Sequence, residues 1–173
     1  MTSEQPLLSL RTCLGRFATG VAVVSFDAGD GPRGITVNSF TSVSIDPPLV
    51  LVSVARRAHS HAALRGRRFC VNVLAAEQEL LAHVFAGARP TPESGVAEAG
   101  LALPWVEDAT TPRLHGSLSW LCCKPWREYD GGDHTLFVGQ VVDFGYRDGS
   151  PLAFHASAFA RIVQEEAGIE GLL

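Results

Sequence analysis

Long apolar runs are missing from this sequence. No stretch reaches the roughly 18 apolar residues that a helix needs to cross a bilayer. The N-terminus, MTSEQPLLSLRTCLG, also lacks the basic start and the apolar core of a secretory signal peptide. We therefore expect a cytoplasmic protein that has no membrane association.

An excess of charge of one sign is missing too. The 14 Lys and Arg residues stand against 18 Asp and Glu residues, the net charge is −4, and no long run of either sign occurs. A nucleic-acid-binding protein would show a basic stripe, so we expect no nucleic-acid partner. Small anionic ligands are not excluded, because they need only a few local donors.

Several common signatures are absent. The chain has no G-x-G-x-x-G loop, no internal repeat and no regular alternation of strands and helices. A parallel, doubly wound sheet is therefore not expected. No Ser–His–Asp or Cys–His pairing has a recognisable local signature, which argues against a hydrolase.

Cysteine is scarce, and no C-x-x-C pair exists among Cys13, Cys70, Cys122 and Cys123. The adjacent Cys122 and Cys123 would point to opposite faces of a strand. We expect free thiols, buried or half-buried, in a reducing compartment. A zinc site or a redox pair is the alternative.

Histidine forms one suggestive pair, the H-x-H of His59 and His61. Such a pair can be half of a metal site, but a carboxylate should follow, and Arg65 stands there instead. We therefore expect no metal. His83 and His115 are expected to be exposed or structural.

The sequence does contain enough apolar residues for a hydrophobic core, since 46% of its 173 residues are hydrophobic. A chain of this length predicts one domain, over residues 1–173. A domain of this size needs no disulfide to fold.

Short periodic segments separated by Gly- and Pro-rich turns predict mostly strands. Helical spacing over 6–18 predicts an N-terminal helix that ends near Gly20, and the same spacing is present over 77–88. A short helix followed by a turn is expected over 60–68. Strands are expected over 20–27, 34–46, 48–55, 69–75, 114–129, 134–147 and 151–163. Residues 87–113 show weak periodicity and predict a long loop, with a short helix near 93–99.

About seven short strands favour a barrel or sandwich with antiparallel pairing. The 34–46 strand should place Val37 and Val43 on one side, and Asn38 and Ser44 on the other. The 48–55 strand is nearly all apolar, so we expect it to be buried on both faces.

Polar groups are unusually dense between 34 and 61. A row of Asn38, Ser39, Ser42 and Ser44 along a strand could bind the edge of a flat heterocycle with alternating donors and acceptors, such as a flavin. The alternative is a polar strand face turned to solvent.

A possible anion site follows directly. Arg56 and Arg57 precede the start of the short helix, and Ser60 lies near that start. Helix N-termini present free N–H groups, so this segment is a plausible phosphate site. Exposed arginine pairs are common, which is the competing interpretation.

Five segments together resemble one family. They are RFATGVAVVSF, GITVNSFTSVSIDPPLVLVSVARR, FCVNVLAAEQELLAHVFAG, GDHTLFVGQVVDF and PLAFH, in this order, within about residues 11–162. They resemble the flavin reductase component of two-component flavin-dependent monooxygenases. The resemblance implies a mainly β fold, an FMN-binding split β-barrel of antiparallel Greek-key strands with a few short helices. It also implies a homodimer that binds FMN or FAD without a Rossmann domain.

The resemblance assigns cofactor-binding roles by motif. The isoalloxazine ring would be lined by Thr36, Val37, Asn38 and Ser39. The ring edge and ribityl chain would meet Ser42, Val43 and Ser44. The phosphate end would lie at Val54, Ala55, Arg56 and Ser60, and the segment closing over the flavin would contain Phe85 and Ala86.

The same resemblance assigns the nicotinamide site to Gly132, Asp133 and His134. The two glycines before Asp133 permit a tight turn that would aim His134 into the pocket. His134 is the residue expected at the catalytic centre, where it would hold the nicotinamide nucleotide and not transfer the hydride.

Three features depart from the family pattern. Ala58 stands where relatives often have a hydroxyl, so one phosphate contact is expected to be lost or replaced by Arg57. The run KPWRE at 124–128 is untypical and affects the loop before His134. His155 stands near a position where many relatives show an Arg–Gly pair.

The implied activity is hydride transfer from NADH or NADPH to FMN or FAD, with the reduced flavin passed to a separate oxygenase. The flavin carries this chemistry and the protein positions the reactants. Two other hypotheses remain: a flavin-binding protein without turnover, and a flavoenzyme that oxidises an organic substrate directly. The second would need an extra substrate pocket, which the 87–113 segment could build.

Overall fold

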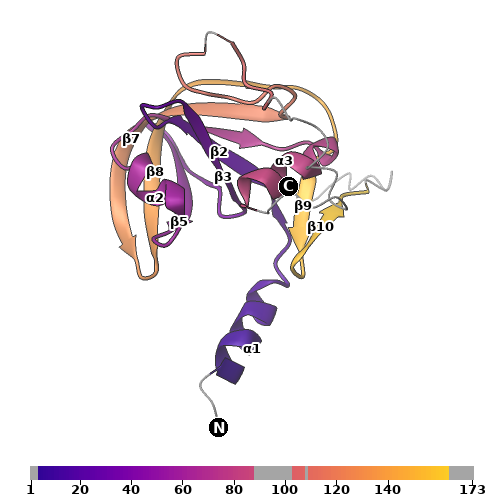
Figure 1. Cartoon of the computed structure of the whole chain (residues 1–173). Coiled ribbons are helices and arrows are strands. Elements are labelled where there is room, and N and C mark those ends of the chain that lie inside the picture. The colour runs from indigo at the N-terminus through magenta and orange to yellow at the C-terminus, as the bar shows by residue number, and fades with distance from the viewer. Residues whose placement is uncertain (1–3, 88–102, 108, 164–173) are drawn as a thin grey trace.

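The computed structural model describes residues 4–87, 103–107 and 109–163 (Figure 1). Its helices are α1 (Glu4–Leu14), α2 (His59–Leu64) and α3 (Glu79–Phe85), the last preceded by the 3-10 turn η1 (Ala76–Gln78). The shorter strands are β1 (Thr19–Gly20), β2 (Ala22–Asp27), β3 (Pro32–Val37), β4 (Thr41–Ile45), β5 (Pro48–Ala55), β6 (Phe69–Val73), β9 (Leu152–His155) and β10 (Ala158–Arg161). The two long strands are β7 (Ser119–Gly131) and β8 (His134–Tyr146).

Seven strands form the main sheet in the order β3-β2-β6-β7-β8-β5-β4, and every neighbouring pair is antiparallel. A second small sheet has the order β1-β9-β10. The predicted mainly β, antiparallel class with a few short helices is therefore confirmed. No helix in the described part of the chain is long and apolar enough to span a membrane.

The expected single strand over 34–46 is wrong, because the chain breaks after Val37 and resumes as β4 at Thr41. Ser39 explains the break. Its hydroxyl donates to the carbonyl of Ser53 (2.8 Å) and accepts from the backbone N–H of Ser53 (3.0 Å). These two bonds tie the chain to β5 at the point where β3 has left its partner β2.

The short link between β3 and β4 forces the sheet to curl. β3 and β4 lie at opposite edges of a seven-stranded sheet that would be about 29 Å wide if flat. The link from Val37 to Thr41 can span only about 14 Å. The sheet must therefore bend back on itself, and β3 does contact β5 across the curl.

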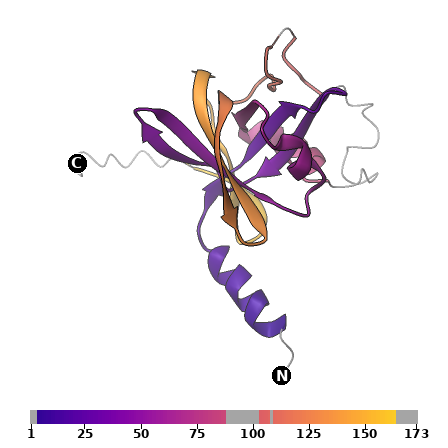
Figure 2. The same ribbon diagram turned by 90° about the vertical axis from the view of Figure 1, so that its left-hand side faces the viewer.

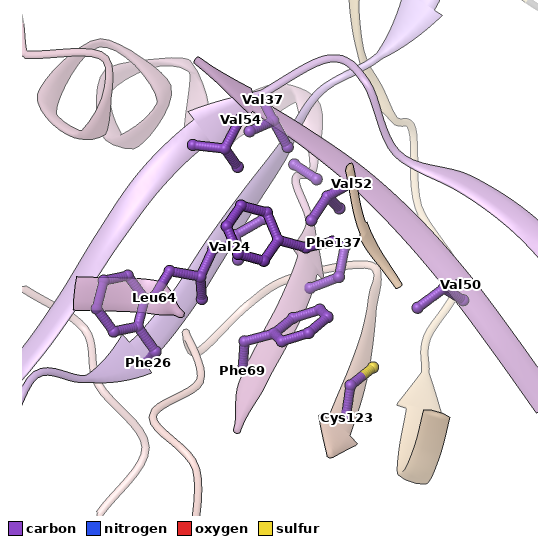
Figure 3. Close-up of a cluster of buried hydrophobic side chains, with 12 residues drawn as sticks. Val24, Phe26, Val37, Val50, Val52, Val54, Leu64, Phe69, Cys123 and Phe137 are labelled. Atoms are coloured by element: carbon purple, nitrogen blue, oxygen red, sulfur yellow. The ribbon is translucent and has the colours of Figure 1, made fainter. Parts of the chain in front are cut away.

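The core fills the inside of the curl. Figure 3 shows side chains from several strands and α2 pointing toward one another. This cluster consists of Ala22, Val24, Phe26, Val37, Val50, Val52, Val54, Leu64, Phe69, Val71, Cys123 and Phe137. A second cluster, Val21, Val23, Leu74, Ala82, Leu114 and Leu152, lies on the other side of β2. Because consecutive side chains alternate in direction, β2 contributes to both clusters.

β5 is a strand as predicted, but it is not buried on both faces. Val50, Val52 and Val54 are buried, whereas the alternate residues Leu49 and Leu51 are half-buried. The curl explains this difference, because only its inner face is filled by the core.

The expected single strand over 151–163 is also wrong. β9 and β10 form a hairpin whose turn residues, Ala156 and Ser157, have φ values of 49° and 67°. Left-handed backbone at two consecutive residues is typical of a tight hairpin turn. Neither residue is the Gly or Asn that usually marks such a turn, so the sequence concealed it.

The N-terminal helix ends at Leu14, earlier than its expected end near Gly20. Both views show α1 standing away from the body of the sheet (Figures 1 and 2). Leu10, Leu14 and Phe17 are accordingly exposed. The strands over 20–27, 69–75, 114–129 and 134–147 and the helices over 60–68 and 77–88 are confirmed, with small shifts of their ends. The helix expected near 93–99 lies outside the described residues.

Candidate functional site

A cavity of about 690 Å³ opens between β3, the start of α2 and the end of α3. It is lined by Gly34, Ile35, Thr36, Ala55, Arg57, Ala58, His59, Ser60, Val84, Phe85, Ala86 and Gly87. A second cavity of about 210 Å³ is lined by Val21, Thr36, Val37, Asn38, Ala86, Phe154 and Phe159. Thr36 and Ala86 border both, so the two cavities are neighbours along β3, and we call them together the cleft. Its size is that of a small-molecule binding site.

The wall of the cleft is an edge strand. β3 pairs only with β2, so alternate backbone N–H and C=O groups of β3 point away from the sheet without a strand partner. The Thr36 hydroxyl donates to the carbonyl of Ala82 in α3 (2.7 Å). This bond fixes the distance between β3 and α3, which form the sides of the cleft.

Phe85 closes the cleft over Gly34. A Cβ atom on Gly34 would lie 2.7 Å from Cδ1 of Phe85, which is closer than carbon atoms can approach. The Phe85 ring also packs edge-on against Trp105, with centroids 5.6 Å apart. Glycine at 34 is therefore what lets the Phe85 ring approach the strand so closely.

One end of the cleft carries a positive charge. Arg57 lines the larger cavity beside Ser60, and it has no ion pair or hydrogen bond with the described residues. Ala58 occupies the position before α2 and supplies no side-chain cap. The Arg57 charge also helps to lower the pKa of Asp133. A ligand with an anionic tail would find here one guanidinium without a hydrogen-bond partner among the described residues, and one hydroxyl.

Arg56 has a different task. Its Nε donates to the carbonyl of Gly132 (2.9 Å), its Nη2 donates to Oδ1 of Asp130 (3.0 Å), and its backbone N–H donates to the carbonyl of Asp133 (2.9 Å). These bonds hold the β7–β8 hairpin against the end of β5. The Arg56 guanidinium is therefore already bonded to the hairpin.

The hairpin turn is itself well ordered by local bonds. Asp130 accepts from the N–H of Gly132 (2.8 Å), and Gly132 has a φ of 75°, where glycine is favoured. The pKa of Asp130 lies below its usual value, first because of this N–H and then because of Arg56. The carboxylate therefore stays charged at neutral pH. The bonds from Arg56 to Asp130 and Gly132, which we call the Arg56 clamp, persist under these conditions.

His134 follows the turn. Its Nδ1 lies 2.7 Å from Oδ1 of Asp133, and the pKa of Asp133 is lowered mainly by this hydrogen bond. The imidazole is partly exposed. In the register of β5 and β8, His134 is the direct partner of Ala55, which borders the larger cavity. The hairpin thus lies one residue from the cleft, although Gly132, Asp133 and His134 do not line it.

The structure brings together part of the predicted set. Lining the cleft are Thr36, Val37, Asn38, Ala55, Ser60, Phe85 and Ala86. Ser39 bonds to β5, and Val54 lies in the core. Ser42, Val43 and Ser44 lie on β4 at the far edge of the sheet and do not border either cavity.

Of the histidines outside the hairpin, His59 lines the larger cavity, and the others have structural or surface positions. Nε2 of His61 lies 2.8 Å from the Thr135 hydroxyl, and the ring packs edge-on against Phe137. His83 contacts Phe159 edge-on, and His155 is exposed. Among the described residues, no three His, Cys, Asp or Glu side chains gather as metal ligands would.

Sequence reasoning missed two aromatic residues of the smaller cavity, Phe154 and Phe159. Five residues apart on a single strand, they would face opposite sides. In the β9–β10 hairpin they are direct partners, with ring centroids 5.6 Å apart. Phe154 and Phe159 could have been placed together from the sequence only if the turn at Ala156 had been predicted.

Comparison with known proteins identifies the family. Residues 14–162 match the family described as flavin reductase like domain. The match covers most of the chain, so this protein belongs to that family. The resemblance inferred from the five motifs is thereby confirmed.

Individual relatives carry names that fit this family. The FMN reductase (NADH) SmoA of Agrobacterium fabrum is 40% identical over 159 residues, which cover 91% of this chain and 87% of that protein. The reductase component of 4-nitrophenol 4-monooxygenase/4-nitrocatechol 2-monooxygenase from Rhodococcus opacus is 35% identical over 162 residues, covering 92% and 84%.

Solved structures share the fold. The NADH:FAD oxidoreductase SgcE6 of Streptomyces globisporus, in complex with NAD and FAD fragments, superposes with a TM-score of 0.80 at 35% identity. The superposition covers 96% of this chain and 98% of that one.

The Arg56 clamp yields a test of the hairpin. Asp130→Asn removes the charge that Arg56 binds in this exposed ion pair, so amide hydrogen exchange at 131–134 should become about threefold faster at neutral pH. Because the pKa of Asp130 is lowered, the wild-type clamp should persist above about pH 3.9 and weaken only as the pH falls through the lowered value.

The matched control is Asp148→Asn, an exposed aspartate whose carboxylate has no hydrogen bond or ion pair with the described residues. Mass spectrometry of deuterium uptake measures both variants. Equal protection of 131–134 in Asp130→Asn and wild type would contradict the clamp.

Proposed function

We propose that this protein transfers a hydride from NADH or NADPH to FMN or FAD and releases the reduced flavin to a separate oxygenase. The observation that carries the proposal is the free edge of β3 beside a cavity of about 690 Å³. Membership of the flavin reductase like family and the names of the relatives support it.

The cleft fits the shape and polarity of a flavin. A flat ring with alternating donors and acceptors along its edge needs a row of fixed backbone partners, and the open edge of β3 at 34–38 offers one. Asn38 adds a side-chain amide at the end of that row. When bound, the flavin would supply the redox chemistry, as the acceptor of the hydride.

The protein's own residues would position the flavin and stabilise the charge of its reduced ring. Donors fixed on β3 before the reaction would stabilise the negative charge of a reduced ring without moving. Phe85, held on Gly34, excludes water from one side of the cleft. Arg57 and Ser60 would bind the phosphate end, with Arg57 taking the place of the hydroxyl absent at Ala58.

The hairpin would receive the nicotinamide nucleotide. Asp133 would orient His134 through the bond to Nδ1, and Nε2, which has no hydrogen bond with the described residues, would be available to a nucleotide. Arg56 fixes the hairpin one residue from the cleft. We propose that Gly132, Asp133 and His134 bind the nucleotide, and that Ser42, Val43 and Ser44 contact the distal part of the flavin.

A homodimer is part of the proposal. α1 stands away from the body with Leu14 and Phe17 exposed, and Ile45 on edge strand β4 is 89% exposed. Apolar side chains on a projecting helix and an edge strand favour coverage by a second chain. Trp126 is exposed as well, whereas Trp105 and Trp120 pack within the chain.

Three further assignments complete the proposal. We infer that the curled sheet is the core of an FMN-binding split β-barrel. We also infer that residues 1–173 form one domain, with the core at about 11–162. The cytoplasmic location remains an expectation from the sequence.

The activity has a direct test. Purified protein should oxidise NADH only when FMN or FAD is present, and anaerobic mixing with NADH should bleach the flavin on the timescale of turnover. Absorbance at the flavin band and at the NADH band measures both. Flavin that binds but stays oxidised would favour a binding protein without turnover, and flavin-independent NADH oxidation would contradict the proposal.

The phosphate role of Arg57 can be separated from ring binding. Arg57→Ala should raise the Kd for FMN about tenfold, or about 1.4 kcal/mol, and leave the Kd for riboflavin, which has no phosphate, unchanged. Arg67→Ala removes the same charge away from the cleft and should change neither. Fluorescence quenching measures all the affinities. An equal loss for both ligands would show that Arg57 acts on the fold or the ring.

A further inference from the structure

Two thiols face each other across neighbouring strands, far from the cleft. Cys70 on β6 and Cys122 on β7 are direct partners in the antiparallel register. Their Sγ atoms lie 3.2 Å apart and share a hydrogen bond. Cα atoms of directly opposed residues lie about 4.5–5.5 Å apart, inside the range that a disulfide spans.

The two thiols differ in access. Cys122 is 8% exposed and lines a cavity of about 270 Å³ together with Arg68, Arg113 and Asp143, whereas Cys70 is 0% exposed and does not line it. A small oxidant that enters the cavity therefore meets Cys122 first. This cavity shares no lining residue with the cleft.

The surroundings favour a thiolate on Cys122. The pKa of Cys122 is lowered, first because Cys70 can donate its S–H to the thiolate, and also by the positive charges of Arg113 and Arg68. Burial and Asp143 oppose this effect. The pKa of Cys70 is raised by the same hydrogen bond and by burial. Thiolates, and not thiols, attack peroxides.

We propose that Cys122 is a peroxide-sensitive nucleophile and that Cys70 is its resolving thiol, so that a hydroperoxide converts the pair into a disulfide between β6 and β7. The arrangement is that of redox-sensitive cysteines, in which a reactive thiolate at a cavity lies beside a second thiol. The exposed Cys13 and the core residue Cys123 take no part.

The chemistry balances in two steps. The Cys122 thiolate attacks one peroxide oxygen, an S–O bond forms, the O–O bond breaks, and the second oxygen leaves as hydroxide. Cys70 sulfur then attacks Cys122 sulfur, an S–S bond forms, the S–O bond breaks, and hydroxide leaves again. Protons from the thiols convert both hydroxides to water. The two sulfurs lose two electrons and the peroxide gains two.

The oxidant would come from the protein's own product. This source rests on the proposed function: free reduced flavin that meets dioxygen before a partner oxygenase is reoxidised, and hydrogen peroxide forms. The thiol pair would then report reduced flavin that was not consumed.

The test uses the full-length Cys13→Ser protein, which leaves three thiols and excludes bridges between chains. After treatment with hydrogen peroxide, denaturation and alkylation, we expect one alkylated cysteine, Cys123, and a peptide cross-link between Cys70 and Cys122. The intact mass before alkylation should fall by that of two hydrogen atoms. Three alkylated thiols, or a bridge that includes Cys123, would overturn the proposal.

Single variants assign the roles. Cys70→Ser should accumulate a sulfenic acid on Cys122 that dimedone traps. Cys122→Ser should form no bridge, and Cys70 should oxidise at least tenfold more slowly than Cys122 does. If Cys70→Ser gives no dimedone adduct and Cys122→Ser still oxidises at the wild-type rate, the roles are wrong. The mass data from the Cys13→Ser protein carry the test even where a Cys70 or Cys122 variant folds poorly.

A separate arm tests the source of the oxidant. NADH, flavin and dioxygen replace added peroxide, with and without catalase. Bridge formation that catalase prevents supports the flavin source. If added peroxide forms the bridge and turnover does not, the thiol chemistry stands and the flavin source fails. If added peroxide forms none, the thiol pair is inert whatever the activity of the cleft.

Discussion

The short link between β3 and β4 is the constraint on which this structure depends. Two strands adjacent in sequence occupy opposite edges of a seven-stranded sheet. Three residues connect them, and that length is too short to cross a flat sheet. Curvature is therefore imposed by connectivity. It encloses the core of Figure 3 and leaves β3 as an edge whose backbone groups have a partner on one side only.

A chemically useful cleft follows from that edge. α3 is held against β3 by the Thr36–Ala82 hydrogen bond and by Phe85 on Gly34, which produces a slot with a polar wall and an aromatic cover. The neighbouring arginines divide two tasks. Arg56 is occupied in fixing the hairpin, so Arg57 is the one left to meet an anion.

The sequence predicted local structure well and long-range placement poorly. Alternation and turn residues located most strands, and the motifs identified the family that the comparisons confirm. The alternation over 34–46 continues through Ser39, so nothing local revealed that its hydroxyl binds Ser53 and ends the strand. For the same reason Arg56 and Arg57 looked equivalent: only the long hairpin of β7 and β8, distant in sequence, distinguishes them. The turn at Ala156 and Ser157 was hidden by residues that rarely form one.

The claim that matters most is that the exposed edge of β3 is where a flat redox ring binds. Backbone amide NMR spectra of the protein, recorded during titration with oxidised FMN, test it directly. The account predicts that the largest shift changes fall at 34–38 and 85–87, with smaller ones at 57–60. Changes gathered instead around Arg68 and Arg113, with the β3 amides unmoved, would contradict it.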